Sequence, residues 1–176
     1  RVVAAAGAIG IYHHGTQTDR FWREGRIEAA REYLRCMRDQ GVAVGLGTHL
    51  PEVVEYAEER GWDLDFYMTC LYALGRVPRE SALAAGRATH AAEVFREDDP
   101  PQMTRVIRQT RKTCLAFKIL AAGRKCANQD AVREAFRYAY TSIKPTDAVV
   151  VGVFPKYEDQ VALNVRHAFD ALARPE

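Results

Sequence analysis

The sequence lacks the features that mark membrane, secreted and nucleic-acid-binding proteins. No apolar run approaches the roughly 20 residues that a membrane-spanning helix needs. The opening RVVAAAGAIG has no basic region and runs straight into IYHHG, so we do not expect a signal peptide. The 25 basic and 23 acidic residues nearly cancel, at +2, and give no electrostatic basis for binding nucleic acid or a membrane. We therefore expect no nucleic-acid or membrane partner.

Disulfide and metal patterns are also missing. The four cysteines form no CxxC pair and no compact spacing, which argues against a disulfide scaffold or a structural zinc site. His14, His49 and Cys70 could form a metal triad across adjacent strand ends, but no HxH or HExxH spacing supports one. We predict no metal, and reduced thiols in a cytoplasmic protein.

What the sequence does contain is a regular alternation of apolar runs and amphipathic segments. Near-continuous apolar strands separated by helices indicate a parallel sheet and an α/β fold. The strands are expected at 9–14, 42–49, 64–72, 114–120 and 148–154.

The intervening segments have the three-and-four spacing of helices. Thr18 or Asp19 is expected to cap the first helix, Pro51 to begin the second and Asn128 to cap the fourth. The helices are expected at about 18–41, 51–61, 102–111, 129–143 and 157–172.

Two architectures fit this alternation: an open doubly wound sheet and a (β/α)8 TIM barrel. The first strand lacks a GxGxxG turn, which weakens the dinucleotide-binding open sheet. A barrel needs eight units over about 250 residues, so five units predict its C-terminal part, strands four to eight. We expect one partial barrel domain over 1–176, with open sheet edges that favour self-association. The long insertion at 73–101 is either a lid or disordered.

Candidate site residues follow the ends of the predicted strands. His13 and His14 close the first strand, and alternation sends one toward the barrel mouth and the other toward the helices. Either could act as an acid–base residue or simply cap the next helix. Lys118 stands in an apolar run, where a charge is costly unless it is paired or functional. We favour an inward Lys118, which would suit a catalytic or phosphate-binding role.

Two neighbouring loops carry small and basic residues suited to an anion. AAGR (121–124) ends in Gly123 and Arg124, and VGVFPK (151–156) supplies Gly152 and Lys156. Barrel phosphate sites frequently use the loops after strands seven and eight. The sequence therefore predicts a phosphate-binding pocket between these loops.

With these segments placed, the chain resembles the C-terminal half of the aldo/keto reductases. The closest stretches are GLGTHLPEVVEYAEERGWDLDFYMTCLY (45–72) and TDAVVVGVFPKYEDQVALNV (146–165). The resemblance implies hydride transfer between NADP or NAD and a small-molecule carbonyl substrate. It implies that His13 polarises the carbonyl and that Phe117 stacks on the nicotinamide. Lys118 would face the phosphates, and Gln160 and Asn164 the adenosine end.

The chain also departs from that family. Gly47 and Thr48 replace the expected Ser-Asn, so Thr48 stands where an amide would contact the nicotinamide, and Phe66 replaces a glutamine. The arginine that selects a 2′-phosphate is missing unless Lys156 substitutes. The family's catalytic Asp, Tyr and Lys would lie on strands one to three, outside residues 1–176. Residues 1–176 alone are therefore expected to be inactive.

Two other functions remain open. FKILAAGR (117–124) is similar in form to the phosphate-binding strand of deoxyribose-phosphate aldolases, which suggests a lyase or isomerase for a phosphorylated sugar that uses Lys118. The other is a barrel that binds phosphate without chemistry.

Overall fold

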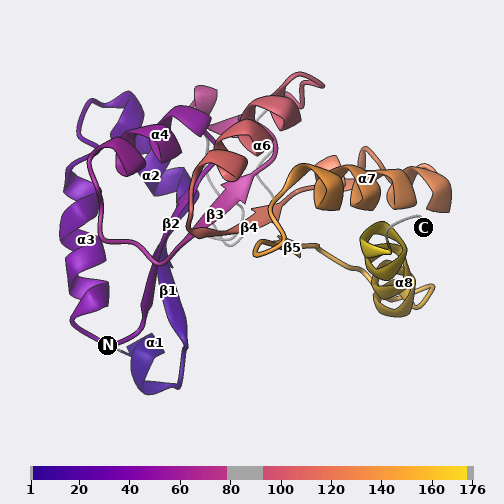
Figure 1. Ribbon diagram of the computed structural model, residues 1–176, viewed down its shortest axis with the longest axis horizontal. Helices are drawn as coiled ribbons and strands as arrows, with labels where there is room; N and C mark the ends of the chain where they lie inside the picture. The colour runs from indigo at the N-terminus through magenta and orange to yellow at the C-terminus, as the bar shows by residue number, and fades with distance from the viewer. Residues whose placement is uncertain (1, 79–92, 174–176) are drawn as a thin grey trace.

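A computed structural model describes residues 2–78 and 93–173 and shows an α/β fold with a five-stranded parallel sheet (Figure 1). The strand order is β1-β2-β3-β4-β5, and each neighbouring pair is parallel. A strand forms in each of the five predicted segments, although the last one ends at Val150 and not at residue 154. The strands are β1 (Gly10–His13), β2 (Ala43–Thr48), β3 (Phe66–Cys70), β4 (Thr113–Phe117) and β5 (Ala148–Val150).

Helices and short 3-10 turns connect the strands. Pro51 begins α4, and the Asn128 side chain caps α7 by accepting from the Ala131 N–H at 2.9 Å, both as predicted. The helical elements are α1 (Val2–Ala5), α2 (Gly15–Arg23), α3 (Ala29–Arg38), α4 (Pro51–Glu59), η1 (Leu74–Arg76), α6 (Asp99–Gln109), η2 (Ala121–Gly123), α7 (Gln129–Ser142) and α8 (Gln160–Leu172).

The prediction of one helix over 18–41 is wrong. The chain forms α2 and α3, because Gly25 adopts φ +66° and breaks the helical path between them. Thr18 and Asp19 are buried inside α2 and do not cap it; His14 is the residue that precedes its first turn. The break directs α3 onto β1 and β2, so two short helices cover the start of the sheet.

The sequential strand order determines how the helices cover the sheet. A doubly wound sheet requires the strand order to reverse, and this order does not. Right-handed crossovers in one direction put successive helices on one face. The burial pattern agrees: Val44, Leu46 and Tyr67 on that face are fully buried, whereas Tyr12 and Val150 on the opposite face are exposed.

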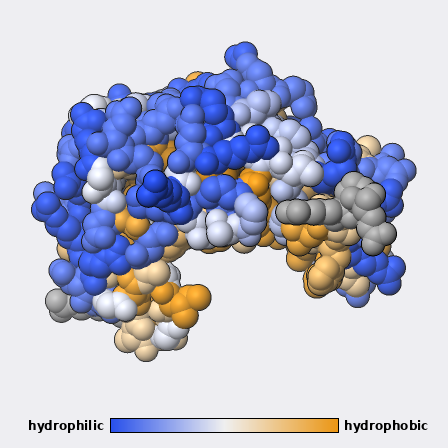
Figure 2. Space-filling view, viewed as in Figure 1, coloured by the Kyte–Doolittle hydropathy of each residue, from blue (hydrophilic) through white to orange (hydrophobic). Residues whose placement is uncertain are grey.

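Apolar surface is also exposed on α8. Figure 2 shows apolar residues at this end of the molecule, to the lower right. The exposed positions recur at helical spacing and form a stripe along α8. They are Val161, Val165, Phe169 and Leu172.

Gly45 lies on the face of the sheet opposite the helices, which we call the open face. An aromatic ring packs against it there, so a side chain at this position does not fit. A Cβ at Gly45 would overlap the ring of Phe66 from the neighbouring strand. Gly45→Ala is therefore expected to lower the free energy of unfolding by about 1–2 kcal/mol. Urea denaturation measures this, with Gly152→Ala as the control, because a Cβ at Gly152 meets nothing within 4 Å. Equal stability of the two variants would contradict this packing.

About half of the predicted insertion at 73–101, residues 79–92, lies outside the described part of the chain. In its described part, Ala73 to Gly75 are buried, and the buried Asp99 carboxylate accepts from the Ala73 N–H at 3.2 Å. The helix expected at 102–111 begins earlier, at Asp99. Among the described residues no helix is both long and apolar enough to cross a membrane, and all four cysteines are free.

Candidate functional site

A pocket of about 750 Å³ lies between the loops that follow β4 and β5 and the start of α8. Adjacent parallel strands place their carboxyl ends side by side, so these two loops meet at one edge of the sheet. Six of the residues predicted to bind a cofactor line the pocket. They are Phe117, Lys118, Gly123, Gly152, Gln160 and Asn164.

The loop after β4 has an unusual backbone. The strand ends at Phe117, three residues before the predicted end, so Lys118 lies beyond the strand and not inside it. Lys118, Ala121 and Ala122 all adopt left-handed φ values, +61°, +49° and +52°. A left-handed φ at a residue other than glycine costs on the order of 1 kcal/mol, and strain of this kind clusters at functional sites.

Lys118 is paired with a carboxylate at the edge of the pocket. Its Nζ lies 3.4 Å from both carboxylate oxygens of Glu93 and 5.5 Å from the centre of the Phe95 ring. The side chain is about three-quarters buried, at 23% exposure. Glu93 is thus a protein partner for this charge, and binding of an anion by Lys118 with Gly152 stays a prediction.

The other basic residues predicted for the pocket lie outside it. The Arg124 guanidinium stacks 4.0 Å above the Phe95 ring and donates to the Ala121 carbonyl at 3.3 Å. Lys156 is exposed, with its ammonium 5.2 Å from the ring centre of Tyr157. Neither residue lines the pocket, and a role of Lys156 in place of the missing arginine stays a prediction.

The start of α8 contributes amide and carboxylate groups to the pocket. The Gln160 Oε1 accepts from the Phe154 N–H at 2.8 Å, and its Nε2 donates to Glu158 at 3.4 Å. Asn164 lies one helical turn further on and also lines the pocket. These groups can donate and accept hydrogen bonds, as a nucleoside requires.

A buried polar network occupies the carboxyl end of β2. One oxygen of Asp19 accepts from the Thr48 hydroxyl at 2.6 Å, and the other lies 2.6 Å from His49 Nδ1. The His49 N–H also donates to this carboxylate, at 3.3 Å. Asp19, Thr48 and His49 are 1%, 0% and 4% exposed. Thr48, predicted to bind the cofactor, therefore lies in this network and does not line the pocket.

Sequence reasoning assigned Asp19 only a capping role. The available signal was its position: a carboxylate six residues after a strand end, in a fold whose active sites form there. Its partners Thr48 and His49 are about thirty positions away in the chain, so spacing alone does not reveal the network.

The two histidines at the end of β1 separate, as alternation predicts. His13 is buried against α2 and α3, with Nδ1 2.7 Å from the Thr18 hydroxyl and its ring stacked on Phe21. Burial, assisted by the charge of His14, lowers the pKa of His13 from 6.5 to about 4. His13 thus faces the helix layer, and its predicted contact with a carbonyl substrate does not fit this placement. The half-buried His14 has its ring centre 6.3 Å from that of Tyr12, on the side of the open face.

His49 connects the buried network to the pocket. Its ring meets that of Phe117 edge-on, with 5.7 Å between the ring centres. His49 follows β2 and Phe117 ends β4, and β3 lies between these two strands. The contact therefore crosses the carboxyl end of the sheet. Within residues 2–78 and 93–173 no three His, Cys, Asp or Glu side chains gather to hold a metal ion. The hypothetical triad of His14, His49 and Cys70 does not form.

Comparison of the chain with protein-family models, with curated proteins and with solved structures gives no match. The fold is an α/β domain built on a parallel sheet, and the candidate functional residues lie around the carboxyl edge of that sheet.

Proposed function

We propose that the pocket between the β4 and β5 loops binds NAD or NADP, as the cofactor site of an oxidoreductase similar to the aldo/keto reductases. The observation that supports this is the convergence of Phe117, Lys118, Gly123, Gly152, Gln160 and Asn164 on one pocket. These residues come from three segments of the chain: the resemblance indicates Phe117, Lys118, Gln160 and Asn164, and the small-residue loops supply Gly123 and Gly152. The reaction we propose is hydride transfer between the nicotinamide and a carbonyl.

The chemistry of the lining suits a dinucleotide. Pockets for cofactors are mostly apolar, with a few polar groups that fix orientation. Phe117 offers a ring face for the nicotinamide, Lys118 a positive charge for phosphate, and Gln160 and Asn164 amides for the nucleoside. The start of α8 adds the positive end of a helix dipole on the same side.

We further propose that the five strands are strands four to eight of a (β/α)8 barrel. Three observations support this: the unreversed strand order, the partly exposed open face, and the exposed apolar stripe on α8. In a closed barrel the open face becomes the interior, where its apolar side chains are buried.

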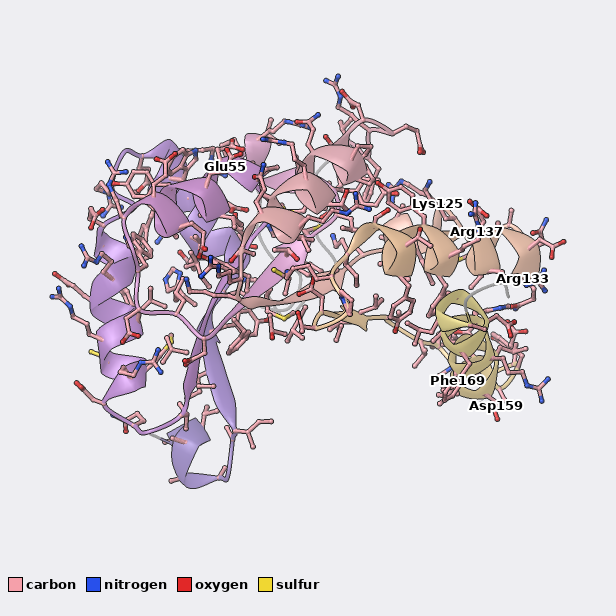
Figure 3. The ribbon with its side chains drawn as sticks, viewed as in Figure 1. Glu55, Lys125, Arg133, Arg137, Asp159 and Phe169 are labelled. Atoms are coloured by element: carbon pink, nitrogen blue, oxygen red, sulfur yellow. The ribbon has the colours of Figure 1, made fainter. Side chains whose placement is uncertain are left out.

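Lys118→Ala tests the pocket. Loss of a partly buried charge that contacts phosphate is expected to weaken NADPH binding about tenfold, equivalent to about 1.4 kcal/mol. Titration of NADPH fluorescence measures the dissociation constant. Lys125→Ala is the matched control: Lys125 pairs with Glu97 at 3.1 Å and does not line the pocket (Figure 3). Its affinity should stay within twofold of the unaltered protein. Absence of NADH and NADPH binding, or equal effects of the two variants, would overturn the proposal.

A lyase that forms a Schiff base on Lys118 fits the contacts less well. Schiff-base formation needs Nζ of Lys118 to attack a carbonyl, whereas Nζ here contacts the Glu93 carboxylate and lies over the Phe95 ring. Borohydride trapping with an aldehyde sugar phosphate separates the two functions. A covalent adduct on Lys118 would favour the lyase.

A further inference from the structure

We propose that a second pocket, on the other side of the β4 loop, binds a small carboxylic acid with an apolar body. This second pocket has a volume of about 380 Å³ and lies between the start of α6, the β4 loop and α7. Ile119 lines both the second pocket and the pocket between the β4 and β5 loops, so the β4 loop separates the two. The inference goes beyond the proposed function and needs no cofactor.

The base of the second pocket is apolar. Its lining includes Leu71, which follows β3, Ile119 of the β4 loop, and the two prolines in the first turn of α6, Pro100 and Pro101. Leu71 and Ile119 belong to the hydrophobic core. A pocket of a few hundred Å³ with such a lining suits a small molecule that has an apolar body and a few polar atoms.

Arg124 gives the second pocket a positive charge that is not neutralised. Its guanidinium lies 4.0 Å from the centre of the Phe95 ring and donates to the Ala121 carbonyl at 3.3 Å, and Arg124 lines the pocket. These contacts orient the guanidinium and leave its other N–H groups available. No carboxylate of residues 2–78 or 93–173 pairs with it, so an anionic ligand would supply its counter-charge.

The other charged side chains that line the second pocket have protein partners. Lys125 lies 3.1 Å from Glu97, and Glu134 accepts from the Arg137 guanidinium at 2.6 and 2.8 Å. One positive charge is therefore left over, at Arg124. A guanidinium matches a planar carboxylate through two parallel N–H···O bonds, and a single excess charge suits a singly charged carboxylate better than a doubly charged phosphate.

Tyr72 provides a second hydrogen-bond donor in the same pocket. Its side chain is 1% exposed and lines the pocket, and its hydroxyl makes no hydrogen bond within the part of the chain that the structure describes. The Tyr72 ring meets Phe95 edge-on at 4.9 Å between centres, so Tyr72 and Arg124 pack on the same ring. Burial, with the charge of Glu97 second, raises the pKa of Tyr72 to about 12, so the hydroxyl stays protonated at pH 7. Buried hydroxyls normally have a partner, and a ligand carboxylate would provide one.

Arg124→Gln and Tyr72→Phe test this assignment, with 4-phenylbutyrate as the probe and 4-phenylbutyramide as its neutral counterpart. Isothermal titration calorimetry at pH 7 measures the dissociation constants. We expect 4-phenylbutyrate to bind with a constant below about 1 mM and the amide to bind at least about tenfold more weakly. Each substitution should weaken 4-phenylbutyrate binding about tenfold, because each removes a hydrogen bond to a charged group.

Arg133→Gln is the matched control. Arg133 is an exposed arginine of α7 that pairs with Asp130 at 2.6 Å and does not line the second pocket (Figure 3). Its substitution should leave the affinity within about twofold. Absence of 4-phenylbutyrate binding up to about 10 mM, equal affinity for the amide, or equal effects of Arg124→Gln and Arg133→Gln would each overturn the proposal. If Tyr72→Phe does not fold, Arg124→Gln decides, since Arg124 is exposed.

NMR of the unaltered, ¹⁵N-labelled protein shows which pocket the probe occupies. Addition of 4-phenylbutyrate should shift the amide signals of Tyr72 and Tyr138, which line only the second pocket. Shifts confined to Gly152 and Asn164 would place the probe in the other pocket and overturn this inference. The result is independent of NADPH: failure of the protein to bind NADPH would remove the proposed function and leave the second pocket standing.

Discussion

Asp19→Ala is expected to lower the free energy of unfolding by about 4 kcal/mol, because it leaves several buried donors without an acceptor. The Asp19 carboxylate is 1% exposed and accepts from the Thr48 hydroxyl, the His49 N–H and the His49 ring. These groups are buried, and each unsatisfied buried group costs roughly 1–3 kcal/mol. The small alanine also leaves space beside Gly75, which packs on the carboxylate.

Urea denaturation at pH 7 measures this effect against two controls. Asp170→Ala removes an exposed carboxylate of α8 and should change stability by less than about 0.5 kcal/mol. Thr48→Val removes a hydroxyl that donates to Asp19 and accepts from the Leu50 N–H at 3.0 Å, and leaves His49 on Asp19, so its cost should be about 2 kcal/mol. A loss below about 1 kcal/mol for Asp19→Ala would mean that the network does not hold the end of β2 to α2.

The sheet was predictable because its strands are local features of the sequence. Each apolar run is bounded by polar or small residues, and the strand–helix alternation permits few arrangements other than a parallel sheet. The grouping of Phe117 and Gly152 also follows from topology, since β4 and β5 are adjacent and their ends lie together. Gln160 and Asn164 join them because α8 begins shortly after β5.

The errors in the prediction have a common physical origin. Ile119 was assigned to a strand because it is apolar, but it is a buried loop residue, and hydrophobicity does not distinguish a buried loop from a strand. The left-handed backbone of Lys118 and Ala122 has no sequence signal, since neither is glycine. Helical spacing continued across Gly25, where tertiary packing instead favours two helices.

Contacts between side chains far apart in the sequence were the other feature that could not be predicted. The Asp19–His49 contact joins α2 to the end of β2, and the Lys118–Glu93 contact joins the β4 loop to a segment without regular structure. Neither follows from periodicity, because side-chain pairs of this kind depend on how the loops pack after the sheet has formed. The residues that line the pocket were thus predictable, because their grouping follows from the strand order. The contacts of His49 were not predictable in this way.

Lowering the pH is expected to destabilise the protein through His13. The pKa of this imidazole falls from 6.5 to about 4 on folding, mainly because burial removes water from the ring and secondarily because of the charge on His14. Between these values the unfolded chain binds a proton that the folded protein does not, so stability decreases as the pH falls. The effect is absent above about pH 7, reaches about 2 kcal/mol at pH 5 and about 3 kcal/mol at pH 4.

His13→Asn isolates this contribution from the carboxylates, which also titrate at low pH. The asparagine amide can still reach the Thr18 hydroxyl, which lies 2.7 Å from His13 Nδ1, but it does not titrate. The unfolding free energies of the two proteins should therefore converge as the pH falls from 7 to 5, by about 2 kcal/mol. Urea denaturation at pH 7, 6 and 5 gives both curves. Parallel curves would show that His13 takes up its proton as readily in the folded protein as in the unfolded chain, and that its ring is open to water instead of packed against Phe21.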